Sequence, residues 1–160
     1  TLRVDGRDQA TPSGAFLWRR PVDGVIDSVT LDGASVVRAH HDGYAPVRHE
    51  RTLTRDDAGL VVEDRLTGVA DPPPAELRWH LAPGDAVVDG ATVVWTGQRA
   101  RVSLTVTGAD DLRVVTGCES APAGFRSTGL EMWEASPTVI ARCRPSRGNV
   151  VVTRIVAGRR

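Results

Sequence analysis

The sequence contains no lysine, and all twenty of its basic residues are arginine. Twenty acidic residues balance them, so the formal net charge is zero. Proteins that bind nucleic acid or anionic membranes through their overall charge carry a basic excess, so neither partner is expected here. The sequence also has no apolar run of the roughly 18 residues needed to cross a bilayer, and no signal peptide is recognisable. We therefore predict a protein without a membrane span, and any polyanionic partner must bind a local patch.

Cysteine is scarce, with Cys118 and Cys143 as its two instances. Their spacing matches neither a CxxC motif nor the framework of a small disulfide-rich protein. We interpret both as small buried residues, with a single disulfide between them as the alternative. No flanking pattern marks either one as a nucleophile.

The common catalytic motifs and helical periodicity are also missing from the sequence. There is no GxSxG, no HExxH, no Walker loop, no GxGxxG after a strand and no EF-hand loop. No segment repeats its apolar residues at the spacing of an amphipathic helix. Residue chemistry alone therefore indicates a strand-rich protein with a few candidate polar clusters.

Period-two alternation in short segments is the dominant pattern that is present. In "ARVSLTVTG" at 100–108, Val102, Leu104 and Val106 point to one side, while serine and threonine point to the other. Glycine, proline and aspartate separate such segments. We predict an all-β fold, an antiparallel β-sandwich of about ten strands, with a closed barrel as the alternative. Three tryptophans lie in strand patterns and are predicted to belong to the core: Trp18, Trp79 and Trp95.

The length of 160 residues, of which 41% are hydrophobic, suits one well-buried core. The segment "ADPPPAE" at 70–76 is too short for a domain linker, and we interpret it as a rigid loop within the domain. We therefore expect a single domain over residues 1–160. The sequence starts at Thr1 instead of Met, so we expect a piece of a longer protein. Its N-terminus does not indicate the compartment, and a bacterial periplasmic or secreted location is compatible with it.

Two adjacent histidines stand near the end of the predicted strand "VVRAHHDGY" at 36–44. Neighbouring strand residues point to opposite faces, so His40 and His41 cannot bind one ion without a bulge. Asp42 and Gly43 are typical of a tight turn, which makes the polar end of a strand the simplest interpretation. A catalytic site and a metal site are the alternatives.

A third histidine, His49, shares a strand face with Val47, Arg51 and Leu53 in "PVRHERTL" at 46–53. This face predicts a buried imidazole, whose nitrogens need partners. One interpretation is a structural histidine bonded to a backbone carbonyl or to the neighbours of Arg51. The alternatives are a metal ligand and a substrate contact. The fourth histidine, His80, is predicted to be exposed.

Three stretches in order carry a resemblance to a known family: "TLRVDGRDQATPSGAFLWRR", "SVVRAHHDGYAPVRHERTLTRDDAGLVVEDRLTG" and "LRWHLAPG". They resemble the C-terminal β-sheet domain of heparinase II/III-like polysaccharide lyases, over residues 1 to about 84. The resemblance implies a sandwich joined to an N-terminal α/α toroid that is absent from this sequence. It also implies cleavage of acidic polysaccharides, such as glycosaminoglycans or alginate, by β-elimination. We expect the sandwich to form one wall of the substrate groove and to be inactive alone.

The same resemblance implies roles for individual residues. Tyr44 is similar to a proton-transfer residue near the cleft and is the catalytic candidate. We expect it to be partly exposed together with His41, and Tyr44→Phe to leave stability nearly unchanged. The substrate-binding candidates are His41, Arg38 and Arg65, because guanidinium groups match carboxylates and sulfates. The further arginines Arg48, Arg51 and Arg78 could do the same, and solvated strand faces are the alternative for each.

A zinc site is the one cofactor that the resemblance implies. His49 is similar to the histidine of the metal site, whose other His and Asp ligands belong to the region aligned with residues 1–20. This sequence has Thr1 and "FLWRR" there, so the ligand set looks incomplete for a site that needs about four donors. The rival interpretation of the whole chain is a non-catalytic carbohydrate-binding or structural sandwich, in which some of the four tryptophans stack on sugars.

Overall fold

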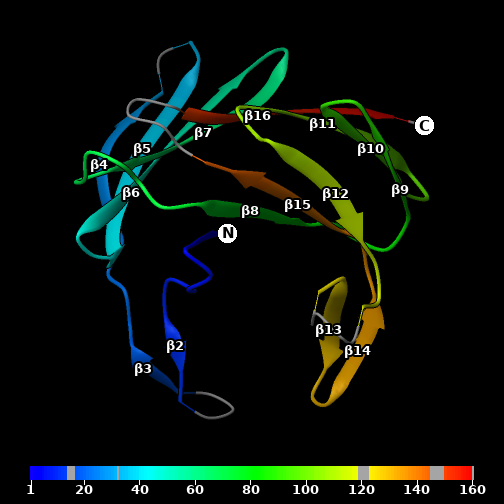
Figure 1. Ribbon diagram of the computed structural model, residues 1–160. Helices are drawn as coiled ribbons and strands as arrows, with labels where there is room; N and C mark the ends of the chain where they lie inside the picture. The colour runs from blue at the N-terminus through cyan, green and yellow to red at the C-terminus, as the bar shows by residue number, and fades with distance from the viewer. Residues whose placement is uncertain (14–16, 32, 119–122, 145–149, 160) are drawn as a thin grey trace.

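The computed structural model describes residues 1–13, 17–31, 33–118, 123–144 and 150–159 (Figure 1). Within these ranges the chain forms sixteen strands and no helix, so the all-β prediction is confirmed. The strands outnumber the ten or so that were predicted. Three of the additional strands, β1 (Leu2–Val4), β2 (Thr11–Pro12) and β3 (Trp18–Arg20), contain two or three residues each. Such strands are too short for an alternation pattern to identify.

The larger sheet has eight antiparallel strands. In spatial order they are β4 (Val25–Thr30), β5 (Ser35–Tyr44), β6 (Val47–Asp56), β7 (Gly59–Thr67), β16 (Val150–Arg159), β11 (Ala100–Thr107), β10 (Thr92–Thr96) and β9 (Asp85–Asp89). Successive hairpins build the two halves of this sheet. The last strand, β16, pairs with β7 on one side and β11 on the other and so joins the halves.

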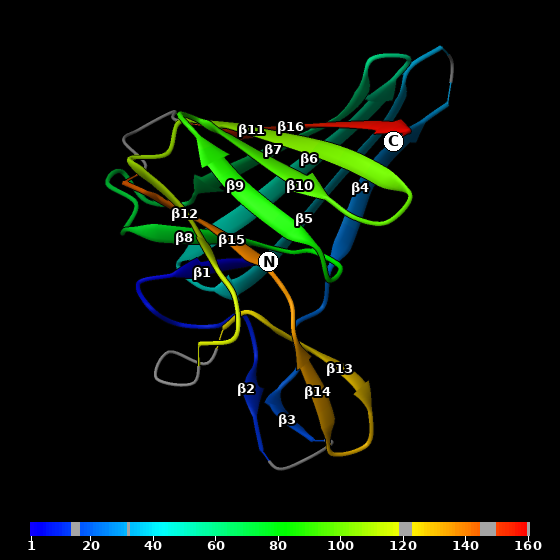
Figure 2. The same ribbon diagram turned by 90° about the vertical axis from the view of Figure 1, so that its right-hand side faces the viewer.

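The smaller sheet has four antiparallel strands in the order β1, β8 (Ala75–His80), β15 (Thr138–Cys143) and β12 (Asp111–Val115). It lies beneath the eight-stranded sheet (Figures 1 and 2). Two further hairpins extend from the side of the molecule on which the smaller sheet lies. They are β2–β3 and the pair formed by β13 (Phe125–Gly129) and β14 (Met132–Ala135).

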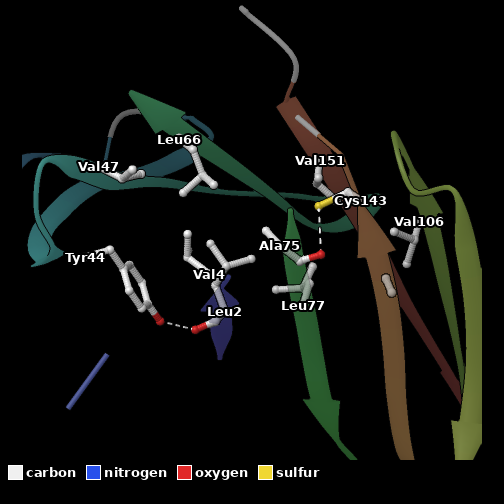
Figure 3. Close-up of a cluster of buried hydrophobic side chains, with 11 residues drawn as sticks. Leu2, Val4, Tyr44, Val47, Leu66, Ala75, Leu77, Val106, Cys143 and Val151 are labelled. Carbon is white, nitrogen blue, oxygen red and sulfur yellow. Dashed lines mark hydrogen bonds between the residues drawn. The ribbon is translucent and has the colours of Figure 1, made fainter. Parts of the chain in front are cut away.

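The main core lies between the two sheets (Figure 3). Alternate residues of both sheets point into it, as the period of two requires. The smaller sheet contributes Leu2, Val4 and Leu77, and the larger sheet contributes Leu66 and Val151. Two faces covering one apolar layer make this arrangement a β-sandwich. The inward direction predicted for the strand at 100–107 is confirmed, because Leu104 and Val106 are buried.

Two predictions about the core need correction. Trp18 is 62% exposed, because β3 belongs to a two-stranded hairpin that no sheet covers. Trp79 does pack against the core, and Trp95 is half-buried with its indole N–H donated to the Ala82 carbonyl at 2.9 Å. Cys118 is also only half-buried, whereas Cys143 is buried as predicted. These two cysteines, both in described segments, do not form a disulfide.

The loop at 68–74, which contains most of the segment "ADPPPAE", connects β7 of the larger sheet to β8 of the smaller one. Among the described residues, no helix is long and apolar enough to span a membrane.

Candidate functional site

The strand β5 continues through His41–Tyr44, and the chain reverses three residues later than the turn-forming pair suggested. Ala45 and Pro46 form the turn, joined by a cis peptide bond, and the register of β5 with β6 shifts between His41 and Tyr44. The Ala45 amide donates to the Asp42 carbonyl at 3.0 Å, so Asp42 and Gly43 do begin a hydrogen-bonded turn, but the reversal of the strand that they predicted falls on Ala45 and Pro46. Glycine at position 43 allows the segment around Gln9 to pack closely against β5, because a Cβ there would lie 2.9 Å from the Gln9 carbonyl oxygen.

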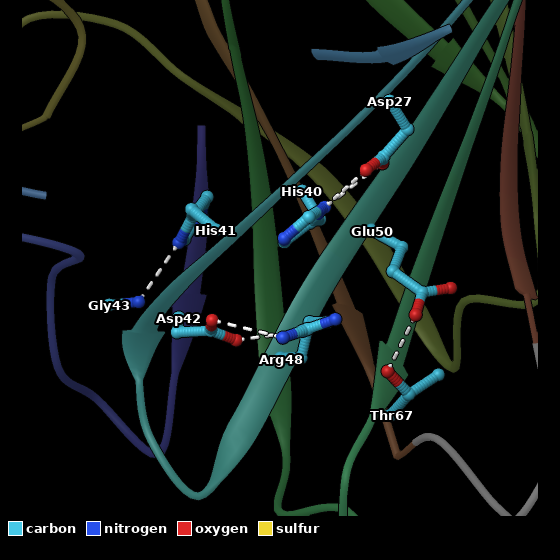
Figure 4. A network of polar contacts seen from close by, with 8 residues as sticks. All are labelled: Asp27, His40, His41, Asp42, Gly43, Arg48, Glu50 and Thr67. Atoms are coloured by element: carbon cyan, nitrogen blue, oxygen red, sulfur yellow. Dashed lines mark hydrogen bonds and ion pairs between the residues drawn. The ribbon is translucent and has the colours of Figure 1, made fainter. Parts of the chain in front are cut away.

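The two adjacent histidines point to opposite faces of the sheet, as predicted. His40 faces outward, and its Nδ1 lies 2.8 and 2.9 Å from the two carboxylate oxygens of Asp27 on β4 (Figure 4). His41 faces inward, directly across from His49 on β6. The distance between His41 Nε2 and His49 Nδ1 is 3.0 Å.

The inward-facing histidines belong to a chain of hydrogen bonds with one direction. The Gly43 amide donates to His41 Nδ1 at 3.2 Å, so a neutral His41 carries its proton on Nε2. That proton is donated to His49 Nδ1. His49 then carries its own proton on Nε2, which lies 2.6 Å from Asp64 Oδ1. One tautomer of each imidazole therefore satisfies every contact.

Asp64 on β7 ends this chain and also binds a guanidinium group. Arg51 donates from Nε to Oδ1 at 2.7 Å and from its terminal nitrogen to Oδ2 at 3.1 Å. We call His41, His49, Asp64 and Arg51 the histidine cluster. Its fourth member, Arg51, lies 5.6 Å from the centre of the Trp79 ring, a cation–π distance.

Burial and charge set the titration of the histidine cluster. Burial tends to raise the pKa of the Asp64 carboxyl, which is 3% exposed, but its bonds to His49 and Arg51 hold that pKa below its ordinary value. The pKa of His41 is lowered, first by burial and then by the neighbouring His49. The cluster therefore favours a neutral His41 and an ionised Asp64.

Asp64 is the residue that the sequence analysis missed. The signal that could have found it is its parity, because Asp64 alternates with Val62 and Leu66, which are both buried. A carboxylate on an apolar strand face requires a charged partner inside the protein. The predicted burial of His49 is confirmed, and its partner is the carboxylate that Arg51 also binds.

Tyr44 lies next to the histidine cluster but inside the core. Its side chain is 1% exposed, and its hydroxyl donates to the carbonyl of Leu2 (Figure 3). Burial raises the pKa of Tyr44 to about 12. The predicted partial exposure is wrong for Tyr44, because its ring packs with the core residues Leu2 and Val47. It is right for the half-buried His41. The catalytic role of Tyr44 stays a prediction.

The other substrate-binding candidates lie elsewhere. Arg38 and Arg65 point outward and line a hollow of about 320 Å³ together with Glu50 and Glu63. They are thus on the opposite face of the sheet from His41, and the structure does not bring the three together. The further arginines each bind a carboxylate of the chain itself. The pairs are Arg48–Asp42, Arg51–Asp64 and Arg78–Glu76.

The histidine cluster does not fit a structural zinc site. His41 approaches Nδ1 of His49 and Asp64 approaches Nε2, so these two groups face different edges of the His49 ring, and the three residues cannot converge on one ion. In the part of the chain that the structure describes, no three histidine, cysteine or acidic residues are placed to hold a metal. Tetrahedral zinc needs about four donors. The zinc content of the protein stays a prediction, which elemental analysis checks.

Comparisons with known proteins agree with one another. A family model described as "Heparinase II/III-like, C-terminal" matches residues 1–146. A heparinase III structure with methylated lysines shares 14% identity at a TM-score of 0.73, over 100% of this chain and 23% of that chain. A heparan sulfate lyase mutant from Pedobacter heparinus shares 15% identity at a TM-score of 0.71, over 100% of this chain and 24% of that chain. At such identity these structures show the fold alone. No curated protein matches the sequence.

Proposed function

Because the chain belongs to the heparinase II/III-like C-terminal family, we propose that it is the β-sandwich domain of a lyase that cleaves uronic-acid-containing polysaccharides by β-elimination. The family match over residues 1–146 carries this proposal. The chain spans only about a quarter of the solved structures that it matches, so the activity belongs to a longer parent protein. In that parent, an N-terminal α/α toroid is the proposed partner of the sandwich.

The reaction needs three groups: one that neutralises the uronic carboxylate, a base that removes the C5 proton, and an acid that protonates the leaving oxygen. We place most of this apparatus on the toroid. The sandwich then forms one wall of the groove and is inactive alone. The amino group of Thr1 is bonded to the Arg78 carbonyl, and burial and then the nearby charge of Arg51 lower its pKa. A polypeptide preceding Thr1 therefore joins the domain beside the histidine cluster.

Within this wall, His41 is the substrate-binding candidate that the geometry favours. It is half-buried, and its neutral ring is held by Gly43 and His49. Arg38 and Arg65 are weaker candidates, because the carboxylates of Glu50 and Glu63 in the same hollow repel an anionic sugar.

The test uses the parent protein and follows the ultraviolet absorbance of the unsaturated uronic acid product. We expect the parent to release this product and the 160-residue chain to release none. In the parent, His41→Gln should lower kcat/KM by about 10- to 100-fold, the scale of a lost positioned polar group. The matched control is His40→Gln on the opposite face, which should leave kcat/KM nearly unchanged. A parent that binds acidic polysaccharide without forming product would overturn the proposal.

A non-catalytic carbohydrate-binding domain is the second candidate function. Two exposed tryptophans favour it: Trp18 is 62% exposed and Trp133 is 71% exposed. Flat aromatic rings on a surface suit stacking against sugars. In that case, polysaccharide should quench the fluorescence of these tryptophans in a parent protein that releases no unsaturated product.

A further inference from the structure

Exposed apolar side chains gather on the two small hairpins. On β2–β3, Leu17 is 68% exposed and Trp18 is 62% exposed. On β13–β14 the exposed residues are Leu130 at 80%, Met132 at 62% and Trp133 at 71%. We propose that these five side chains form one docking surface, and that the N-terminal part of the parent chain covers it. This inference rests on the proposed function, which supplies that partner.

Neither hairpin has a second layer within the domain. Each forms a two-stranded sheet of its own, separate from both large sheets. Two-stranded hairpins are marginally stable in water without packing against another element. In β13–β14, Arg126 and Glu134 form an ion pair across the hairpin. Trp133 lies opposite the small residue Ser127, and its side chain remains exposed to solvent. Large apolar groups left uncovered on one side of a protein mark an interaction surface.

The position of the hairpins indicates which part of the parent chain covers the docking surface. Both project from the same side of the molecule, and Thr1 lies close to where they leave the body (Figures 1 and 2). The amino group of Thr1 donates to the Arg78 carbonyl of β8 at 2.9 Å, which fixes this end of the chain to the smaller sheet. A polypeptide preceding Thr1 therefore leaves the domain towards the hairpins. The family model is that of a C-terminal domain, and the matched heparinase III chain is covered over only 23% of its length.

The first test is hydroxyl-radical footprinting of the parent protein. The oxidation rates of Trp18, Met132 and Trp133 are compared between the native parent and the same protein unfolded in urea. Because oxidation follows exposure, we expect the oxidation rate of each residue to be at least about 10-fold lower in the native parent than in the unfolded one. An uncovered surface, with the exposures given above, should be oxidised almost as fast as the unfolded chain. Native rates within about twofold of the unfolded rates would therefore overturn the docking surface.

The second test uses variants of the parent. Trp18→Ser with Leu130→Ser removes two side chains that are 62% and 80% exposed in this domain. We expect the melting temperature of the parent to fall by about 2–4 °C or more, because covering residues lose their partners. The matched control is Ile26→Ser with Val87→Ser, since these residues are 67% and 64% exposed on the two edge strands of the larger sheet. Equal losses for the two pairs would contradict the proposal.

Two further readouts separate the possible occupants. If protection disappears when the parent is diluted to a monomer, as measured by light scattering, the occupant is a second copy and the proposal is overturned. If protection requires added polysaccharide, the occupant is the sugar and the proposal is overturned as well. Lyase activity is measured on the same samples. A parent that cleaves polysaccharide with unprotected hairpins refutes the docking surface alone, whereas protected hairpins without cleavage refute the proposed activity alone.

Discussion

Single side chains decide what the histidine cluster can do. His49 has both ring nitrogens engaged, and Asp64 accepts bonds from His49 and Arg51 while almost fully buried. A buried carboxylate is tolerated only when charged or polar donors surround it. The cluster is therefore a hydrogen-bonded polar network on the inner face of the larger sheet, and His41 is its half-exposed member.

Replacing Asp64 by asparagine tests this view. Asp64→Asn leaves the guanidinium of Arg51 without its anion and puts an amide NH2 where one acceptor oxygen was, so His49 and Arg51 can no longer all be bonded. We therefore expect a loss of about 3–5 kcal/mol in unfolding free energy. Urea denaturation of the parent or the domain measures it. The matched control is Asp42→Asn, whose carboxylate pairs with Arg48 at the surface and should matter little. Similar losses of unfolding free energy for both variants would show that the buried pairing stabilises the fold no more than the surface pair does.

Tyr44→Phe tests the role of the buried hydroxyl. The variant leaves the Leu2 carbonyl without its donor in the core, and we expect a loss of about 1–3 kcal/mol in unfolding free energy. This corrects the expectation of unchanged stability. Turnover of the parent is measured at a temperature where both proteins are folded. A fall of about 100-fold there would support an acid or base role, whereas near-normal turnover limits Tyr44 to holding β1 against β5.

At the scale of elements, period-two alternation identified the long strands but not their ends. The reversal after β5 falls at Ala45–Pro46, although Asp42 and Gly43 have stronger turn preferences. The close approach of residues 9 and 22 requires glycine at position 43, and this demand comes from segments distant in sequence. Local preference therefore indicated the right region and the wrong two residues.

Glycines at strand ends show the same influence of neighbouring elements. Gly68 and Gly90 both have positive φ, at 87° and 56°. A Cβ at Gly68 would lie 2.4 Å from the Pro46 carbonyl oxygen, whereas one at Gly90 meets nothing within 4 Å. We expect Gly90→Ala to cost about 1–2 kcal/mol for the backbone conformation alone. Gly68→Ala should cost about 1–3 kcal/mol more, because β6 and β7 must separate. Thermal unfolding compares them, and equal costs would refute the steric contribution.

At the scale of the whole molecule, titratable groups that folding removes partly or fully from water predict how stability depends on pH. The pKa values of His41, His80, Asp64 and Glu76 are all lowered, with burial opposing the shift only in the two acids. The unfolded chain therefore binds more protons at low pH, and stability falls as the pH drops below 6.5 and again near 4.

Alkaline pH acts through the opposite shifts. Burial raises the pKa of Tyr44 from 10.0 to about 12 and that of Cys143 from 9.0 to about 11. Their stabilising contribution is complete below pH 9 and is lost as the pH rises through these values. Urea midpoints measured from acid to alkaline pH should therefore peak between about pH 7 and 9. A midpoint that still rises between pH 9 and 11 would contradict this assignment.

The sequence by itself determined the strand character, the opposite directions of His40 and His41, the burial of His49 and the resemblance to its family. Each of these depends on the local period of two or on residue order. Only the tertiary structure decided that Asp64 is the partner of His49 and that Tyr44 bonds to Leu2. It also decided that Trp18 lies outside the core. Strand pairing and sheet stacking bring together residues that are distant in sequence, and alternation shows which face a side chain takes but not what covers that face.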